Sequence, residues 1–330
     1  MMGTMIVTDW HAHWIPPEVT ALFEARTSPP CIRRNAAGAR VFHADAATIL
    51  PLKEHQLDLD LRQTEMDAAG IDRQVLSLAV LYGIGLDRLP AALEDAIIAA
   101  YNNGLARMIR HNGHRFSGLA ALPVHDLTQA PAILEHAMTE QGLLGAVLPA
   151  EAFADRPMAE RYAPLFAAAS RLGAHLFIHP GAWQSPYDPA AGDEAAIIRR
   201  RAVRFQNDLT AAALTFEHTA FLDPYPGATV HLANLGGTLA LLAERIALTA
   251  DRMGLTPEHG DGRLRRILID SASFGPGGLA LAVANLGPNR LLLGSDSPAL
   301  PLAPAIAAVT AAAIGDDERR AILTGQAAKG

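Results

Sequence analysis

This chain of 330 residues has only one cysteine, and it lacks a net positive charge. The single cysteine, Cys31, excludes a disulfide within the chain and fits the reducing conditions of the cytosol. The formal net charge of −7 argues against a basic surface for nucleic acid. No apolar run reaches the roughly 18 residues that a membrane span needs, and the first residues lack the charged and apolar regions of a signal peptide. We therefore expect a cytoplasmic protein that has neither a membrane nor nucleic acid as a partner.

Short apolar runs alternate with longer segments of helical periodicity through most of the chain. The strands that we predict are Met5–Asp9, Gln74–Leu78, Ser117–Leu122, Ala146–Pro149, His175–His179, Ala228–Ala233, Ile267–Asp270 and Arg290–Gly294. The predicted helices are Leu57–Ala69, Ala91–His111, Ala130–Glu140, Ala159–Leu172, Asp208–Leu222, Leu239–Ala250 and Gly278–Leu286. Strands that alternate with helices favour a parallel sheet, and eight of them favour closure into a (β/α)8 TIM-like barrel. We expect residues 1–330 to form one such α/β domain.

Two stretches interrupt this rhythm, at residues 14–56 and 181–205. Both contain several prolines and glycines, and each follows a predicted strand, the first and the fifth. Long loops at that end of a barrel form the walls and lid of the active site. We therefore predict a lid made of these two loops. The run Arg199-Arg200-Arg201 in the second loop is typical of an exposed helix face rather than of an anion site.

Ligand-type side chains stand at the ends of three predicted strands. His11 and His13 follow the first strand, and residues two apart on a strand point to the same face. His179 ends the fifth strand and Asp296 follows the eighth. Active sites of barrels lie at this carboxyl edge. Three imidazoles and one carboxylate suit one divalent metal ion, with zinc expected first and manganese as an alternative.

A divalent ion at this position would supply Lewis acidity. It lowers the pKa of bound water and polarises a carbonyl or carboxylate oxygen. Asp296 could then accept a proton from that water or deliver one to a substrate carbon. Asp296 also suits a helix N-cap with Pro298 in the first turn, and the two roles are compatible.

Further motifs accompany the ligand set. They are the segment from Glu65 to Asp72 (EMDAAGID), Val75-Leu76-Ser77, Asn102-Asn103, the segment from Arg115 to Pro123 (RFSGLAALP), Tyr225-Pro226-Gly227 and the segment from Leu292 to Pro298 (LLGSDSP). With them the chain resembles the amidohydrolase-related family typified by amino-carboxymuconate-semialdehyde decarboxylase and the resorcylate- and salicylate-type decarboxylases. The similarity runs from His11 to about Pro298.

This resemblance implies a metal-dependent enzyme in which His11, His13, His179 and Asp296 are the metal ligands. It also implies a homodimer, because Arg245 falls where some members send an arginine across the interface toward a substrate carboxylate. An exposed Arg245 paired with Glu244 is equally consistent with the sequence.

Two positions depart from the family pattern. The family usually has a histidine at the end of the sixth strand, where this chain has Asn234. Asparagine can orient water or a substrate oxygen, but it cannot take up a proton at neutral pH. The semialdehyde decarboxylase has a substrate-binding arginine after Val-Phe, where this chain has His43. A bidentate carboxylate clamp would thus become a single titratable donor, unless His43 is an ordinary loop residue.

Three aromatic residues follow predicted strands: Trp14 after His-x-His, Tyr82 after the second strand and Trp183 after His179. On loops above the metal they would wall a pocket for a flat or unsaturated substrate. Alternatively, each packs against the protein core. The histidines away from trusted strand ends are predicted to be structural or surface residues, namely His125, His136, His218 and His231.

The resemblance, rather than the residue types alone, implies decarboxylation of a small aromatic or unsaturated carboxylic acid. A metal-dependent hydrolase of an amide, a lactone or a C–C bond is the alternative, and Asn234 favours it modestly because Asp296 alone could serve as its base. A catalytically idle metal-binding scaffold is a third hypothesis. The complete ligand set argues against it, since a structural metal does not need an open site at strand ends.

Overall fold

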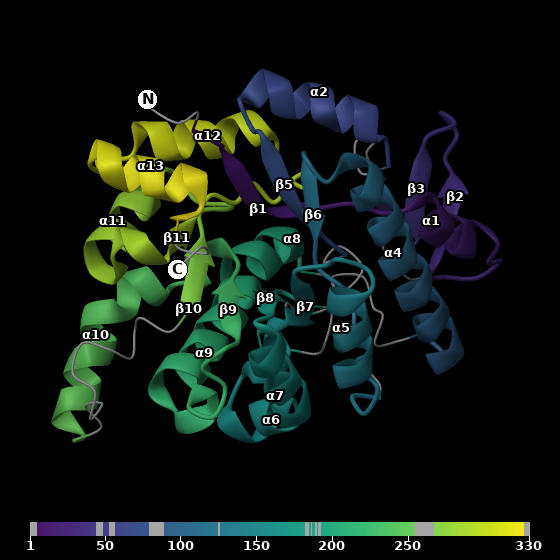
Figure 1. The fold of residues 1–330 in the computed structure, drawn as a ribbon. Coiled ribbons are helices and arrows are strands. Elements are labelled where there is room, and N and C mark those ends of the chain that lie inside the picture. Colours follow the sequence, from purple (N-terminus) through teal and green to yellow (C-terminus); the bar gives the residue numbers. More distant parts are fainter. Residues whose placement is uncertain are drawn as a thin grey trace.

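A barrel of parallel strands forms the centre of the molecule (Figure 1). The computed structural model describes residues 5–43, 49–52, 57–78, 89–124, 126–181, 185, 187–188, 190, 193–254 and 267–326. One sheet has the order β1-β5-β6, with β1 at Thr8–His13, β5 at Arg73–Ser77 and β6 at Phe116–Gly118. The other has the order β11-β10-β9-β8-β7; in chain order its strands are β7 (Gly145–Pro149), β8 (His175–His179), β9 (Thr229–Leu232), β10 (Ile267–Asp270) and β11 (Leu291–Leu292).

Two short contacts close these sheets on one another. Ala120, just past β6, pairs in parallel with Ala146 of β7. Ala12 of β1 pairs in the same way with Ser297, just past β11. The three and the five parallel strands therefore make one ring, which confirms the predicted (β/α)8 architecture.

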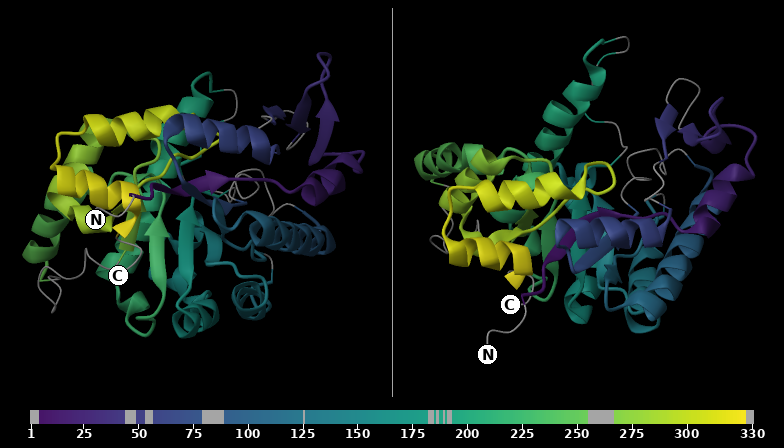
Figure 2. Two further views of the ribbon diagram at one scale, coloured as in Figure 1. Left: turned by 45° about the horizontal axis from the view of Figure 1, so that its top comes forward. Right: turned by 90° about the horizontal axis from the view of Figure 1, so that it is seen from above.

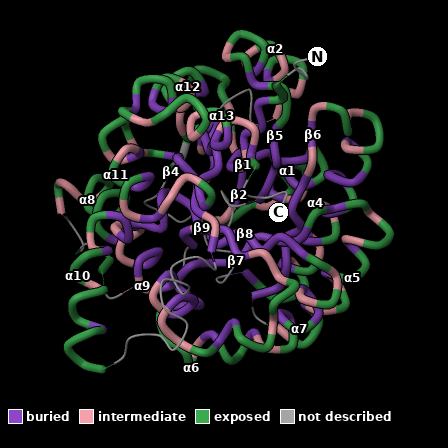
Figure 3. The backbone as a smooth tube through the Cα atoms, turned by 60° about the vertical axis from the view of Figure 1, so that its left-hand side comes forward, coloured by how far each residue is buried: buried purple, intermediate pink, exposed green. Residues whose placement is uncertain are grey.

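Helices cover the outside of the barrel (Figure 2). They are α2 (Leu59–Ala69), α4 (Ala91–Asn112), α5 (Ala130–Thr139), α6 (Arg156–Glu160), α7 (Ala163–Leu172), α9 (Phe205–His218), α10 (Leu239–Arg252), α11 (Pro276–Leu286), α12 (Leu302–Ala311) and α13 (Asp316–Thr324). Buried residues gather on the strands, whereas exposed residues mark the outer helix faces (Figure 3). None of the helices in the described residues is long and apolar enough to cross a membrane.

Burial along the strands follows the barrel geometry. Every residue of β7 is buried, as expected for a parallel strand that is covered on both faces. In β8, the side chains of His175, Phe177 and His179 share one face because alternate residues point the same way. The ring of Phe177 contacts His11 of β1 and His231 of β9, so this shared face is the barrel interior.

Local sequence signals set several helix ends. The side chain of Asp58 caps α2 by accepting hydrogen bonds from the backbone N–H groups of Asp60 and Leu61, at 2.9 and 3.0 Å. The same helix ends at Gly70, whose φ of 71° is left-handed. The predicted continuous helix Ala159–Leu172 is wrong, because α7 starts afresh at Ala163 with Pro164 in its first turn. Proline suits a helix start but disrupts a helix interior.

Other predicted bounds were partly wrong. The first strand is Thr8–His13 rather than Met5–Asp9, because the His-x-His motif itself pairs with β5. The third strand is Phe116–Gly118 and the eighth is only Leu291–Leu292. The helix predicted at Asp208–Leu222 begins at Phe205 and ends at His218, followed by a 3-10 turn at Ala220–Leu222. The predictions for His175–His179 and Ile267–Asp270 are confirmed.

The two long loops contain structure that the sequence did not predict. The first holds α1 (Pro17–Glu24) and an antiparallel sheet of β2 (Cys31–Arg34), β3 (Arg40–His43) and β4 (Ile49–Pro51). This sheet lies beside α1 and α4 at the side of the barrel (Figure 2). The second holds α8 (Ala196–Arg199) and a π-helical segment, Arg200–Arg204, that continues into α9. Arg199, Arg200 and Arg201 are exposed on it, as predicted.

Candidate metal centre

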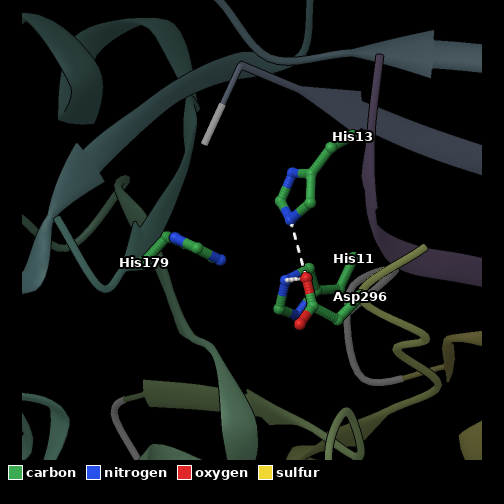
Figure 4. A group of neighbouring side chains, drawn as sticks. All are labelled: His11, His13, His179 and Asp296. Carbon is green, nitrogen blue, oxygen red and sulfur yellow. Dashed lines mark hydrogen bonds and ion pairs between the residues drawn. The ribbon is translucent and has the colours of Figure 1, made fainter. Parts of the chain in front are cut away.

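Four side chains from three places in the barrel converge at its carboxyl edge (Figure 4). His11 and His13 come from β1, His179 from the end of β8 and Asp296 from the loop after β11. One potential ligand atom of each lies within 4.8 Å of the corresponding atoms of the other three. Asp296 Oδ1 lies 3.0 Å from His13 Nε2 and 3.5 Å from His11 Nε2. The predicted convergence of these four residues is therefore confirmed.

Each imidazole is oriented by a contact at its other nitrogen, Nδ1. The partners are the Asp270 carboxylate for His11 at 2.9 Å, Ser77 Oγ for His13 at 3.0 Å and the Pro180 carbonyl for His179 at 2.9 Å. A carbonyl oxygen only accepts, so His179 carries its hydrogen on Nδ1 and Nε2 keeps a lone pair. This is the arrangement of metal-ligating histidines, whose outer partner fixes the tautomer and the ring plane.

A buried nitrogen of His11 that lacks a hydrogen bond also fits a divalent ion at this site. His11 is fully buried, and within the described residues its Nε2 makes no hydrogen bond. Its contact with Asp296 Oδ1 at 3.5 Å is an ion pair, and a buried polar atom without a hydrogen bond is unfavourable. An ion held among His11, His13, His179 and Asp296 would satisfy it, and the donor set of three nitrogens and one oxygen suits such an ion.

Charge within the cluster is balanced between acids and imidazoles. Burial alone lowers the pKa of His11, but the neighbouring Asp270 and Asp296 outweigh it and raise that pKa to about 10. Burial, together with His13 and His11, keeps the pKa of His179 well below its usual value. Burial would raise the pKa of Asp296, yet His11 and His13 hold it low. The cluster thus offers an ionised carboxylate, and a metal ion must compete with a proton at His11.

The ligand-bearing segments are tied together by a second carboxylate, that of Asp9. Its Oδ1 accepts hydrogen bonds from the backbone N–H of His11 at 3.1 Å and of Ser295 at 3.0 Å. Its Oδ2 accepts from Ser295 Oγ at 2.6 Å and from Gln74 Nε2 at 2.8 Å. Asp9 therefore joins the strand that carries His11 to the segment that carries Asp296.

Strained backbone concentrates at the same edge of the barrel. In the part of the chain that the structure describes, four residues other than glycine have left-handed φ, namely Asn234 (54°), Leu235 (56°), Ser273 (67°) and Asp296 (57°). They follow β9, β10 and β11. Each such residue costs about 1–2 kcal/mol, and strain of this kind clusters at functional sites. The rest of the barrel must therefore hold these strand ends in place.

Asn234, the residue found where the family usually has histidine, lies directly beyond β9 and is buried. Its backbone N–H donates to Asp270 Oδ1 at 3.1 Å, while Oδ2 of the same carboxylate contacts His11. The amide oxygen Oδ1 of Asn234 is also buried and has no hydrogen-bond partner among the described residues. The backbone of Asn234 is thus linked to His11 through Asp270.

The structure does not bring the predicted pocket residues into the metal cluster. Trp14 is buried in the hydrophobic core and also lines a groove with residues of α1, α2 and α4. His43 ends β3 and pairs with Cys31 and Ile49 across the small sheet. Arg245 is exposed on α10. Tyr82, Trp183 and His125 lie outside the described residues.

Sequence analysis missed Asp270 as a site residue. It ends β10 at the same carboxyl edge as His179 ends β8, so the rule that found His179 could also have found it. Asp270 is fully buried, and His11 and His231 hold its pKa well below the usual value despite that burial. It is a permanent acceptor for the Nδ1–H of His11. His231, predicted to be a structural or surface residue, is a second donor to it, at 3.1 Å.

A buried ion-pair cluster lies next to the segment that carries His179. Arg204 donates to Glu151 Oε1 at 2.5 Å, and the other Glu151 oxygen accepts from the Gly181 N–H at 2.8 Å. Arg204 also lies 3.0 Å from Asp188 and 3.5 Å from Asp208. One guanidinium thus serves three carboxylates and anchors the loop after β8 to the end of β7.

This sharing predicts a pH effect on stability. Burial raises the pKa of Glu151 to about 7, from 4.5, and outweighs Arg204. A raised carboxyl pKa in the folded state stabilises the fold below pH 4.5, and this contribution is lost as pH rises to 7. The loss is at most about 3.5 kcal/mol, because a tenfold change in an acid dissociation constant corresponds to about 1.4 kcal/mol. The free energy of unfolding, measured in urea, should fall less between pH 5 and pH 8 for Glu151→Gln than for the unmodified chain. An equal fall in both proteins would contradict this prediction.

Known proteins match most of this chain. A family model described as Amidohydrolase matches residues 8–329. The gamma-resorcylate decarboxylase of Polaromonas sp. (strain JS666) is 26% identical over 264 residues, which cover 75% of this chain and 79% of that protein.

Solved structures share the fold. The apo form of "IDCase" from Metarhizium anisopliae superposes with a TM-score of 0.82 at 23% identity, covering 99% of this chain and 97% of that one. A dihydroxybenzoic acid decarboxylase from Polaromonas sp. JS666, solved with manganese and the inhibitor 2-nitroresorcinol, gives a TM-score of 0.72 at 21% identity and covers 98% and 97%. At this identity the likeness establishes the barrel fold.

Proposed function

Because the chain belongs to the amidohydrolase family, we propose that it is a metal-dependent decarboxylase of a small aromatic or unsaturated carboxylic acid. The observation that carries the proposal is the convergence of His11, His13, His179 and Asp296 at the carboxyl edge of the barrel. A relative that matches over 79% of its length is a gamma-resorcylate decarboxylase, which supports the choice of reaction.

The four converging residues would hold the ion, which when bound supplies Lewis acidity toward substrate oxygens. Asp296 moves the proton. Its low pKa keeps it ionised, and the ionised carboxylate has the lone pair that would accept the proton of a substrate hydroxyl and return it to the ring carbon that bears the carboxyl group. The bond from that carbon to the carboxyl group then breaks. Its electron pair restores the ring, and carbon dioxide leaves.

Asn234 has a supporting role in this scheme. Its amide can orient a substrate oxygen but cannot exchange protons at neutral pH, so Asp296 is the proton carrier in the proposal. Trp14, His43, Tyr82 and Trp183 remain proposed pocket residues from the loops after β1, β5 and β8. The lid that these loops would form is part of the same proposal.

A panel of ortho-hydroxybenzoates and muconate-type acids tests the reaction. With the metal-loaded protein in deuterium oxide, we expect carbon dioxide and a product with one deuterium at the carbon that lost the carboxyl group. Asn234 also fits a hydrolase, in which Asp296 alone is the base. Cleavage of amides or lactones without release of carbon dioxide would replace the decarboxylase proposal with this alternative.

One divalent ion is proposed as the cofactor. The donor set suits zinc or manganese. The expectation of zinc as the first choice is not supported, because a structural neighbour was solved with manganese. Elemental analysis of the purified protein, followed by activity measured with each ion added back to the metal-free protein, identifies the working ion.

A homodimer is also proposed, with Arg245 at the interface. Arg245 shares one face of α10 with Leu241 and Leu248, which stand four residues before it and three after it. Leu241 is 69% exposed and Leu248 is 61% exposed. Large apolar side chains this exposed on one helix face mark a surface that another molecule can cover.

Charge placed on this face should separate the subunits. For Leu241→Glu/Leu248→Glu we expect the mass of a monomer by light scattering, where the unmodified chain has the mass of a dimer. Ile197→Glu/Ile198→Glu is the matched control on α8, where both isoleucines are also exposed. A dimer that survives the first pair and dissociates with the second would place the interface on α8 instead.

A further inference from the structure

A line of hydrogen-bonded side chains runs through the barrel interior to the metal cluster. His175 Nε2 lies 3.1 Å from His231 Nδ1, and His231 Nε2 lies 3.1 Å from Asp270 Oδ2. The same oxygen of Asp270 is 2.9 Å from His11 Nδ1. All four residues are buried, and His11, His231 and Asp270 are fully so. The line starts at the first residue of β8 and ends at a proposed metal ligand.

The direction of each hydrogen bond in this line follows from its acceptor. A carboxylate only accepts, so His231 must donate from Nε2 to Asp270. Burial lowers the pKa of His231, and the neutral ring then has a lone pair on Nδ1. His175 therefore donates from Nε2 to that lone pair. The N–H groups of His175 and His231 both point toward Asp270.

Asp270 is held on both oxygens. Oδ2 receives the N–H groups of His11 and His231. Oδ1 receives the backbone N–H groups of Asn234 at 3.1 Å and Ala272 at 2.9 Å. These four donors fill the accepting positions of a carboxylate. The chain also passes closely over it, because a Cβ at Gly294 would lie 2.7 Å from Asp270 Cγ.

We propose that His231, supported by His175, is a positioning residue for the metal centre. His231 is the second donor to Asp270 Oδ2 and so holds this carboxylate in place. The carboxylate in turn accepts the Nδ1–H of His11, and this contact orients the ring so that Nε2 faces the other three ligands. The inference rests on the proposed metal function and adds two residues to it. Neither histidine belongs to the four-residue cluster, so both would act through Asp270.

Packing is the competing role for these rings. His231 lies against Phe177 with ring centroids 4.7 Å apart, and His175 stacks on Trp10 at 5.0 Å. Phenylalanine at position 231 keeps an aromatic ring but removes both nitrogens. Glutamine keeps an N–H that can reach Asp270. The pair His231→Phe and His231→Gln therefore separates packing from hydrogen bonding.

Metal affinity of the full-length chain, measured by competition with a chelator for zinc and for manganese, is the first readout. His231→Phe should weaken binding by about 10-fold, the lower end of the 10- to 100-fold cost of losing an outer partner of a ligand, because His231 acts through the outer partner Asp270. His231→Gln should recover binding to within a few-fold. His175→Phe should have a smaller effect than His231→Phe, because it removes only the outer donor. Equal affinity in all variants, or equal loss in His231→Phe and His231→Gln, would overturn the proposal.

The Nδ1–H proton of His11 gives a second readout that needs no metal. In the metal-free chain this proton is bonded to Asp270, so its downfield NMR signal should be sharp and slow to exchange. His231→Phe should broaden it or speed its exchange, and His231→Gln should restore it. An unchanged signal in His231→Phe would refute the positioning role. If the unmodified chain binds metal but releases no carbon dioxide, the proposed reaction fails while the role of His231 stands.

Discussion

Replacing Asp296 by asparagine is expected to lower kcat by about 10²- to 10⁴-fold, the range that a positioned acid–base group contributes. The asparagine keeps an oxygen beside His13, where Asp296 Oδ1 now lies 3.0 Å from Nε2. It cannot carry a proton at neutral pH. Neither can Asn234, which stands where the family usually has a histidine. Turnover should therefore fall much further than metal content. Steady-state kinetics at saturating metal, with elemental analysis of the same sample, measures both.

Asp316→Asn is the matched control for this change. Asp316 lies at the start of α13 with its side chain 93% exposed. The same chemical change there should leave kcat and metal content as they are. If Asp296→Asn kept its metal and more than half of the original kcat, the proton carrier would have to be another residue.

Replacing His179 by alanine should weaken metal binding by at least about 100-fold, beyond the 10- to 100-fold cost of losing an outer partner. Of the four residues in the cluster, His179 alone comes from β8. His11 and His13 come from β1, and Asp296 comes from the loop after β11. No neighbouring ligand on its own strand can take its place. Isothermal titration of the metal-free protein measures the affinity directly.

His136→Ala controls for the loss of an imidazole. His136 is exposed in the last turn of α5, well separated in sequence from the cluster. Its removal should not change metal affinity. Retention of tight, stoichiometric metal by His179→Ala would show that the ion sits elsewhere, and it would remove the structural basis of the proposed reaction.

The cluster could be predicted because active sites of barrels lie at the carboxyl ends of the strands. His179 and Asp296 are far apart in sequence, but parallel strands of a barrel bring their carboxyl ends to one edge. His11 and His13 needed only the two-residue repeat of a strand. The same rule applied to Ile267–Asp270 would have added Asp270.

The interior line of hydrogen bonds could not be predicted in this way. It depends on how β8 and β9 are aligned, since Phe177 pairs with His231 and His175 with Thr229. The register between two strands is a property of the pair and is not written in either strand alone. A histidine within a strand therefore gave no sign of its partner.

The antiparallel sheet in the first long loop was missed for a different reason. Its strands are three or four residues long, and one of them, Cys31–Arg34, ends in two arginines. Such short segments contain too few residues to show a two-residue repeat. Prolines around them at positions 29, 30 and 51 also favoured a loop. The barrel strands were predicted because they are apolar and recur between helices.

The most direct test of the proposed function is a titration of metal-free protein with manganese or zinc, in which release of carbon dioxide from an ortho-hydroxybenzoate is followed. The four-residue centre predicts that activity rises in proportion to added metal and levels off at one ion per chain. Release of carbon dioxide without any metal, or metal binding that leaves His11, His13, His179 and Asp296 uninvolved, would contradict it.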